Sequence, residues 1–407
     1  MRRVIDQALV YELLRKLVAI DSVNPSLVPG AAGEAAASRF LCEFLREHGI
    51  SAELQEAAPG RPNVVARIEP ARASSATTQS SRAAVRKPGA PAQNDPAALA
   101  ILVHIDTVGA GDMRDPFTPQ ERGGRLYGRG ALDIKSGVAA MCAAALAIVR
   151  DAARLARPLL VAAVVDEECN SIGTAALLRD YRADAAIVLE PTDLRLCVAH
   201  KGYAWFEIVT HGRAAHGSMP EEGRDAIRMM GRVLGLLDAL DHKLAQQKPH
   251  DRLGHASLHA SLISGGQELS SYPAECRLQI ERRTLPGESD AEIEAELRGL
   301  LQGLELRDPT FRATLRRMAS RPPYEISPDA PIARAAAEAI REVRGSVELA
   351  GMAPWTDTAL LASAGIPGVV FGPCGRGLHG AEEYVELESV YACAEVLSRL
   401  ILRFCAA

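Results

Sequence analysis

The sequence predicts an α/β protein of two domains, in which a mixed, mostly parallel sheet flanked by helices is interrupted by an inserted α+β domain. Three continuous apolar runs, 99–105, 159–165 and 185–189, have the length and composition of buried parallel strands. Residues 203–317 instead follow a strand–helix–strand–strand–helix–strand pattern, which is typical of a ferredoxin-like domain. A chain of 407 residues is long enough for both domains.

The composition is that of an ordinary globular protein, with 48% hydrophobic and 24% charged residues. The net charge of −5 provides no footprint for nucleic acid or an anionic membrane, and no apolar run reaches the ~18 residues of a spanning helix. Residues 1–20 carry charges within their apolar pattern, which predicts an amphipathic helix and not a signal peptide. Eight cysteines without a CxxC pair favour reduced thiols in the cytoplasm.

The first part of the chain alternates helices and strands. Helices are expected where apolar residues recur at helical spacing, and strands where short apolar runs are continuous. These patterns predict helices over about 4–19, 33–48, 135–152 and 171–181, and strands over 50–55, 62–68, 99–105, 159–165, 185–190 and 368–372. Residues 70–97 are poor in large apolar side chains, so we interpret them as a mobile surface insertion between two strands.

The inserted domain lies between 200 and 320. Its predicted strands cover 203–210, 255–263, 274–284 and 309–317, and its helices cover 221–240 and 288–303. The chain is thereby divided into a catalytic domain, residues 1–200 with 320–407, and an insert, residues 201–319.

Residues with metal-binding chemistry follow several of the predicted strands. They are His104, Glu168, Glu190 and His379, each after an apolar run, and Asp133, which precedes a buried helix. Because the carboxyl ends of parallel strands meet at one edge of a sheet, these side chains should converge. Two histidines and three carboxylates, one of them shared, predict a two-zinc site with a bridging water.

The acidic triplet DEE (166–168) belongs to this expectation. Three adjacent carboxylates resist burial unless something positive neutralises them, and metal ions do so most directly. An isolated DEE would instead be typical of a solvated acidic turn, but the ordered set of ligands favours metal binding.

Together these segments resemble the M20 metallopeptidase family, which includes acetylornithine deacetylase, succinyl-diaminopimelate desuccinylase, aminoacylase and carboxypeptidase G2. The resemblance covers nearly the whole chain, and its motifs are specific in their order and spacing. They are HIDTV (104–108), GRGALDIKSG (128–137), DEE (166–168), LEP (189–191), GRAAHGSMP (212–220), ERRTLPGE (281–288), TDT (356–358) with FGPCG (371–375), and HGAEEYV (379–385).

The resemblance implies a di-zinc amidase, in which cobalt can replace zinc, with residues 201–319 as a lid and dimerisation domain. His104 and Glu190 would hold one metal, Glu168 and His379 would hold the other, and Asp133 would bridge the two. The family also has a cis peptide after the bridging acid, which here is the bond from Asp133 to Ile134.

Three further roles follow from the resemblance. Asp106 would orient His104, and Glu167 would be the general base, taking a proton from the bridging water and delivering it to the leaving amine. His216, in the lid, would stabilise the oxyanion. In dimeric relatives the matching histidine enters the partner's site, so we expect a C2 homodimer built on the open lid face and the 221–240 helix.

Arg282 and Arg283 both match an RR motif of the family, and strand parity separates them. Arg282 shares a strand face with Cys276, Leu278 and Ile280, which should pack on the lid helices. Arg283 would point to the open face, so it is the candidate for clamping a substrate carboxylate.

The expected activity is hydrolysis of an amide bond beside a carboxylate, with a small N-acyl amino acid as the leading substrate. A dipeptidase or exopeptidase of the family is the alternative, and a catalytically silent binding relative is a third class. The intact Glu167 argues against the third class, because a binding protein has no need for the base. Ser270 occupies the place in GGQELSSYP (265–273) where relatives commonly carry asparagine, so substrate contacts there depart from the family pattern. The sequence names neither the acyl group nor the amino acid.

Overall fold

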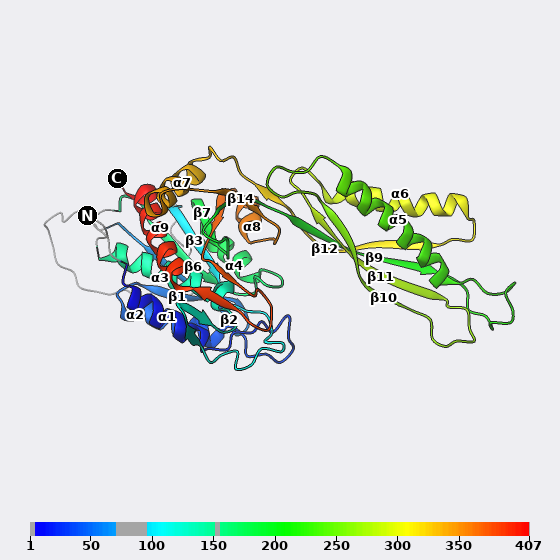
Figure 1. Cartoon of the computed structure of the whole chain (residues 1–407), viewed down its shortest axis with the longest axis horizontal. Helices are drawn as coiled ribbons and strands as arrows, with labels where there is room; N and C mark the ends of the chain where they lie inside the picture. The colour runs from blue at the N-terminus through cyan, green and yellow to red at the C-terminus, as the bar shows by residue number, and fades with distance from the viewer. Residues whose placement is uncertain (1–4, 71–95, 151–154, 407) are drawn as a thin grey trace. The chain divides into compact units, whose positions relative to one another are not determined.

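A computed structural model describes residues 5–70, 96–150 and 155–406 of the chain (Figure 1). These residues form two compact units. Unit 1 runs up to Val198 and resumes over Ile326–Ala350 and from Thr356 onward, whereas unit 2 comprises Ala199–Glu325 and Gly351–Trp355. Several contacts hold the short second piece in unit 2. Trp355 packs edge-on against Tyr203, and the carbonyl of Ala353 accepts a hydrogen bond from Arg283.

The large sheet has nine strands in the order β1-β2-β6-β3-β7-β15-β8-β13, with β14 paired to β8. They are β1 (Ala52–Ala58), β2 (Arg61–Ile68), β3 (Ala97–His104), β6 (Leu159–Val164), β7 (Ala183–Leu189), β8 (Leu196–His200), β13 (Tyr324–Glu325), β14 (Leu349–Met352) and β15 (Gly368–Phe371). The strands β6, β3, β7 and β15 are parallel, and β1, β2 and β8 pair antiparallel. The predicted mixed sheet is therefore confirmed, with its parallel part at the centre.

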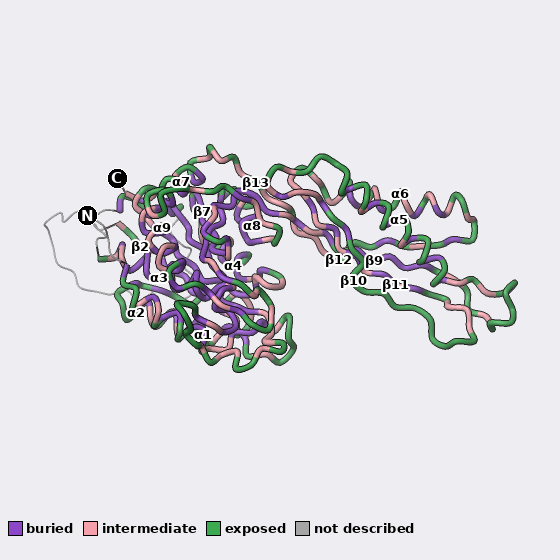
Figure 2. Tube along the Cα trace, in the orientation of Figure 1, coloured by how far each residue is buried: buried purple, intermediate pink, exposed green. Residues whose placement is uncertain are grey.

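Burial explains why the central strands were recognisable as apolar runs. Every residue of β3 and β6 is buried, because helices cover both faces of this part of the sheet. Buried segments accordingly fill the interior of unit 1 (Figure 2). One face carries α1 (Gln7–Val18), α2 (Ala35–Glu47), α3 (Ser136–Val149), α7 (Pro331–Arg344) and α9 (Leu387–Cys405). The other carries α4 (Ile172–Asp180) and α8 (Thr358–Ser363).

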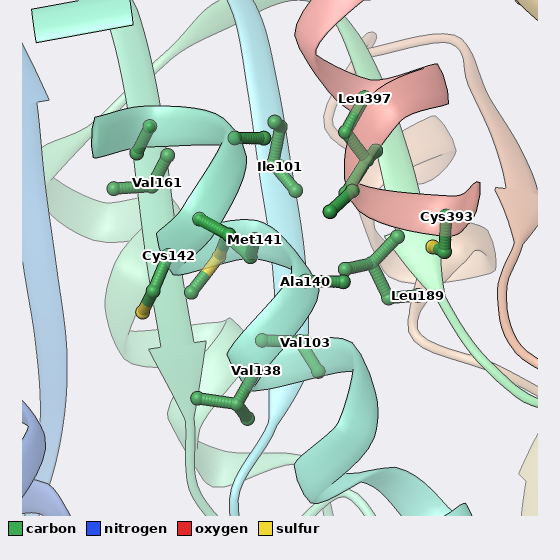
Figure 3. Packing of buried hydrophobic residues seen from close by; sticks show 14 of the residues in the cluster. Ile101, Val103, Val138, Ala140, Met141, Cys142, Val161, Leu189, Cys393 and Leu397 are labelled. Carbon is green, nitrogen blue, oxygen red and sulfur yellow. The ribbon is translucent and has the colours of Figure 1, made fainter. Parts of the chain in front are cut away.

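Helix α3 lies at the centre of this core. Figure 3 shows Val138 and Ala140 of α3 among Ile101 and Val103 of β3 and Leu397 of α9. Within the described parts of the chain, one stretch is long and apolar enough to cross a membrane, Ala131–Val149, and 83% of it is buried inside the structure. Such burial is typical of a core helix, and it accounts for a helix that is apolar on all sides.

A small second sheet in unit 1 connects two loops that carry predicted site residues. It has the order β16-β17-β5-β4 and consists of β4 (Gln120–Arg122), β5 (Arg125–Tyr127), β16 (Gly375–Arg376) and β17 (Tyr384–Glu386). Strand β5 leads towards Asp133, and β16 and β17 flank the loop that contains His379. These strands were not predicted from the sequence, because segments of two or three residues carry no periodicity.

Unit 2 contains a four-stranded antiparallel sheet in the order β10-β11-β9-β12. Its elements are β9 (Gly202–His211), α5 (Ala226–Gln246), β10 (Ser257–Gly265), β11 (Glu275–Thr284), α6 (Asp290–Arg307) and β12 (Ala313–Arg321). This order along the chain and across the sheet is that of a ferredoxin-like fold. Apolar residues of both helices and of the sheet form a core of their own.

Several predicted boundaries differ from the structure by two to six residues. Strand β3 begins at Ala97 and not at Leu99, because Ala97 already pairs with Ala183 of β7. Helix α5 covers Ala226–Gln246 and not 221–240, because Asp225 caps its first turn by accepting from the N–H of Arg228. Residues 71–95, most of the predicted insertion at 70–97, lie outside the described residues, as do 151 and 152 at the end of one predicted helix.

Candidate metal centre

Five predicted metal ligands lie at one edge of the parallel strands in unit 1. His104 is the last residue of β3, Glu190 directly follows β7, and Glu168 lies four residues beyond the end of β6. Asp133 is in a tight turn before α3, and His379 is in the loop between β16 and β17. The peptide bond from Asp133 to Ile134 is cis, as the resemblance implied.

The carboxylate of Asp133 lies between the two histidines. Its Oδ1 is 3.2 Å from Nε2 of His104, and its Oδ2 is 3.3 Å from Nε2 of His379. Each histidine has one further carboxylate: Oε2 of Glu190 is 3.9 Å from His104 Nε2, and Oε2 of Glu168 is 3.4 Å from His379 Nε2. The structure therefore contains two groups of possible metal ligands that share Asp133.

These separations fit metal ligation. Two ligand atoms that each lie about 2.0–2.2 Å from one tetrahedral zinc ion are roughly 3.3–3.6 Å apart, which is close to the observed 3.2–3.9 Å. The buried Oε1 of Glu168 has no hydrogen-bond partner among the described residues. A buried carboxylate oxygen without a donor is costly, and a cation would satisfy it.

The charges of the cluster also favour the binding of cations. Burial and the charge of Glu190 raise the pKa of Glu167 well above its ordinary value, and burial and the charge of Asp133 raise the pKa of Glu168. Burial also raises the pKa of Glu190 well above its ordinary value. The two imidazoles are thus too few to neutralise the carboxylates around them, whereas two divalent cations would be enough.

Asp106 does more than the resemblance implied. Nδ1 of His104 lies 3.0 Å from the backbone oxygen of Asp106 and 3.5 Å from its carboxylate, so the main chain makes the closer contact. The carboxylate accepts hydrogen bonds from the N–H groups of Glu167 (3.1 Å) and Glu168 (3.2 Å). Asp106 therefore fixes the turn that carries both glutamates, besides contacting His104.

The expectation that a metal neutralises the whole DEE triplet is wrong for its first member. Asp166 is fully buried and forms an ion pair with Arg61 of β2, with Oδ1 2.9 Å from Nη2. Asn24 donates to Asp166 Oδ1 (3.0 Å) and to Asp106 Oδ2 (2.8 Å), which links the two acids. Sequence reasoning missed Arg61 and Asn24, because no local pattern marks a buried polar partner from a distant segment.

His216 and Ser270 lie in adjacent loops of unit 2. His216 pairs with Ser271 in an isolated β-bridge, and the N–H of Gly217 donates to the carbonyl of Ser270 at 2.7 Å. The N–H of Ser218 donates to Nδ1 of His216 at 3.2 Å, so the neutral ring carries its proton on Nε2. The exposed ring can thus donate a hydrogen bond from Nε2.

The two arginines of β11 differ in burial as strand parity predicted. Arg282 is 1% exposed and pairs with Glu288, next to the apolar core of unit 2. Arg283 is on the opposite strand face, where its guanidinium contacts Glu281 at 3.0 Å and lies over the ring of Tyr203. Of these two arginines, Arg283 is therefore the one that presents part of its guanidinium on the face of the unit 2 sheet that no helix covers.

Comparisons with known proteins agree with this architecture. The sequence profile of peptidase family M20/M25/M40 matches residues 100–403. Acetylornithine deacetylase of Myxococcus xanthus is 32% identical over 315 residues, covering 76% of this chain and 80% of the relative. Acetylornithine deacetylase of Photorhabdus laumondii is 27% identical over 405 residues, covering 97% of each chain.

Solved structures show the same fold. A tripeptidase from Staphylococcus aureus has a TM-score of 0.77 at 19% identity and covers 98% of this chain and 99% of its own. A dinuclear metal-binding peptidase from Bacillus subtilis, the YXEP protein, has a TM-score of 0.71 at 16% identity and covers 98% of both chains. At these identities the likeness concerns the fold alone.

Proposed function

The chain belongs to peptidase family M20/M25/M40 and is therefore a metal-dependent hydrolase, and we propose that it removes the acyl group from an N-acyl amino acid at a two-zinc site. The observation that carries this proposal is the position of Asp133, with one carboxylate oxygen beside each of two histidines. Both curated relatives named above are acetylornithine deacetylases. N-acetylornithine is accordingly the first substrate to assay.

In this proposal His104 and Glu190 would hold one zinc ion, Glu168 and His379 would hold the other, and Asp133 would serve both. Bound zinc would polarise the amide carbonyl and lower the pKa of the attacking water. Glu167 accepts the proton of that water and delivers it to the nitrogen of the leaving amine. Asp106 keeps Glu167 in place, because its carboxylate holds the N–H of that residue.

Substrate recognition is assigned to unit 2. Arg283 binds the free carboxylate of the substrate, because guanidinium and carboxylate match as a charge-assisted pair. His216 donates from Nε2 to the oxygen that becomes negative in the transition state. Ser270 is joined by its backbone to the His216 loop and contributes to the same part of the site.

We further propose a homodimer through unit 2, in which His216 serves the partner's site. Strand β10 is at an edge of the unit 2 sheet, and it exposes Leu262 (65%) and Ile263 (57%). An exposed apolar edge strand is a template for pairing with another chain. Helix α5 packs beside β10 and completes the proposed surface.

The cytoplasm is the proposed location. All eight cysteines are free thiols in the structure, and six of them are buried. Unpaired buried thiols are usual in a reducing compartment.

The decisive experiment combines metal content with a substrate panel. The purified protein should bind two zinc ions per chain, chelation should abolish activity, and zinc or cobalt should restore it. Activity should be highest on N-acetyl amino acids, with N-acetylornithine tested first, and low on dipeptides. Efficient dipeptide cleavage would instead identify a dipeptidase, and binding without turnover of either class would identify a silent relative.

Replacing Arg283 with alanine should raise KM about 10–100-fold for substrates with a free carboxylate, because a hydrogen bond to a charged group contributes about 1.5–3 kcal/mol. Esters or amides of the same substrates should show no such difference between the variant and the wild type. The matched variant Arg282→Ala should mainly lower Tm, because it leaves Glu288 without its buried partner. A KM effect confined to Arg282→Ala would reverse the assignment.

A further inference from the structure

A buried ion pair lies between the two loops that carry Asp133 and His379. Arg129 precedes Asp133 in GRGALDIKSG, and Glu383 follows His379 in HGAEEYV. Both residues are 1% exposed, and Nη1 of Arg129 lies 2.7 Å from Oε2 of Glu383. Nothing in the proposed mechanism requires either residue to touch substrate.

The carboxylate of Glu383 holds the backbone of the Asp133 loop. Its Oε1 accepts from the N–H groups of Leu132 (2.8 Å) and Asp133 (3.1 Å), and its Oε2 accepts from the N–H of Gly130 (3.1 Å). With the bond from Arg129, one carboxylate therefore accepts four hydrogen bonds. The main-chain N–H of the bridging ligand is one of its donors.

Arg129 makes the reciprocal contact with the His379 loop. While Nη1 bonds to Glu383, Nη2 donates to the carbonyl of Gly380 at 2.9 Å, next to His379. Each loop is thus held by a side chain from the other. Strands β5 and β17 pair along the same two segments, and the N–H of Gly128 bonds to the carbonyl of Glu383 at 3.1 Å.

We propose that Arg129 and Glu383 are positioning residues that set the distance between Asp133 and His379, and thereby the affinity of the metal held by His379 and Glu168. This inference rests on the two-zinc function proposed above. The metal assigned to His104 and Glu190 should depend less on the Arg129–Glu383 pair. His104 is at the end of a fully buried strand, and its ring contacts the backbone of Asp106. Loss of the pair should therefore affect the two metals unequally.

The alternative is a buried ion pair that only stabilises the fold. Breaking such a pair lowers stability by leaving a buried charge without its partner, whether or not metal is present. It would not single out one metal. Unequal loss of metal is therefore the property that separates a positioning role from a purely structural one.

The test uses the full-length protein, stripped of metal and titrated with zinc and cobalt, with Glu383→Gln and Arg129→Lys as variants. The glutamine can still accept from Leu132 and Asp133, but its amide group faces the donors Arg129 and Gly130. The lysine can still pair with Glu383 but lacks the second nitrogen that reaches Gly380. Glu342→Gln is the control, because Glu342 pairs with Arg399 between α7 and α9 in the same unit.

We expect both variants to bind the metal assigned to His379 and Glu168 about 10–100-fold more weakly than the wild type, which is the usual effect of removing a residue that supports a metal ligand. The affinity for the other metal should be almost unchanged. The cobalt absorption spectrum should show the unequal filling directly. The kcat should fall at limiting zinc and recover with excess zinc, while KM stays near the wild-type value. The control should match the wild type in all of these measurements.

Two outcomes would overturn the inference. One is a lower Tm of the metal-free variants with both metal affinities unchanged, and the other is an equal weakening of both metals. A wild type that binds fewer than two metals would count against the two-zinc proposal itself, and not against the role of this pair. Because Arg129→Lys keeps the charge and the pair, it still tests the proposal if Glu383→Gln does not fold.

Discussion

Replacing Glu167 with glutamine is expected to lower kcat by about 10²–10⁴-fold, the usual contribution of a general acid–base residue, while two metals stay bound. Glutamine has the shape of the neutral acid but cannot accept the proton of the attacking water. The N–H of residue 167 should keep its bond to Asp106, so the turn and the neighbouring ligand Glu168 should stay in place. Metal analysis of the variant and single-turnover kinetics would check both halves of the expectation.

Glu168→Gln is the matched control for that variant. Oε2 of Glu168 is 3.4 Å from Nε2 of His379, and its other oxygen is buried without a partner among the described residues, so this change should cost a metal. The donor atoms of Glu167, His104 and Glu190 also lie within 4.8 Å of one another, so the roles of the two glutamates need a direct test. If Glu167→Gln lost a metal while Glu168→Gln kept both, the roles would be exchanged: Glu167 would be the metal ligand and Glu168 the general base.

His216→Ala should be nearly inactive on its own, because loss of one oxyanion donor costs about 10²–10³-fold in kcat. If His216 acts in the partner's site, mixing this variant with Glu167→Ala should restore activity. A mixed dimer then has one site with both residues intact and one with neither. Random exchange makes about half of the dimers mixed, so about a quarter of wild-type activity should return.

The complementation needs proof that subunits have exchanged, for which differently tagged chains and mass measurement of the mixed dimer suffice. A mixture of His216→Ala and Arg283→Ala is a second test, because both residues lie in unit 2. A mixed dimer regains activity only if the two residues of one chain serve different sites. A verified mixture of His216→Ala and Glu167→Ala that stays as inactive as its parents would place the action of His216 within its own chain. A monomeric wild type would lead to the same conclusion.

The sequence alone was sufficient for the fold class and for the convergence of the candidate ligands. Strands such as β3 and β6 are buried along their whole length, so selection for burial leaves continuous apolar runs that can be recognised one by one. The residues at their ends, His104 and Glu168, then had to meet, because parallel strands share one carboxyl edge. Strand parity likewise separated Arg282 from Arg283, since alternation along a strand is a local property.

The tertiary structure alone revealed what holds those ligands in place. Arg61, Asn24, Arg129 and Glu383 each bond to groups far away in the sequence: Glu383 reaches the N–H of Asp133 across 250 positions, and Asn24 reaches Asp166 across 142. Such partners show no periodicity and no spacing rule. A buried polar group must find a partner somewhere, but only the folded chain decides which one lies within hydrogen-bond distance. For the same reason an arginine, and not a metal, neutralises Asp166.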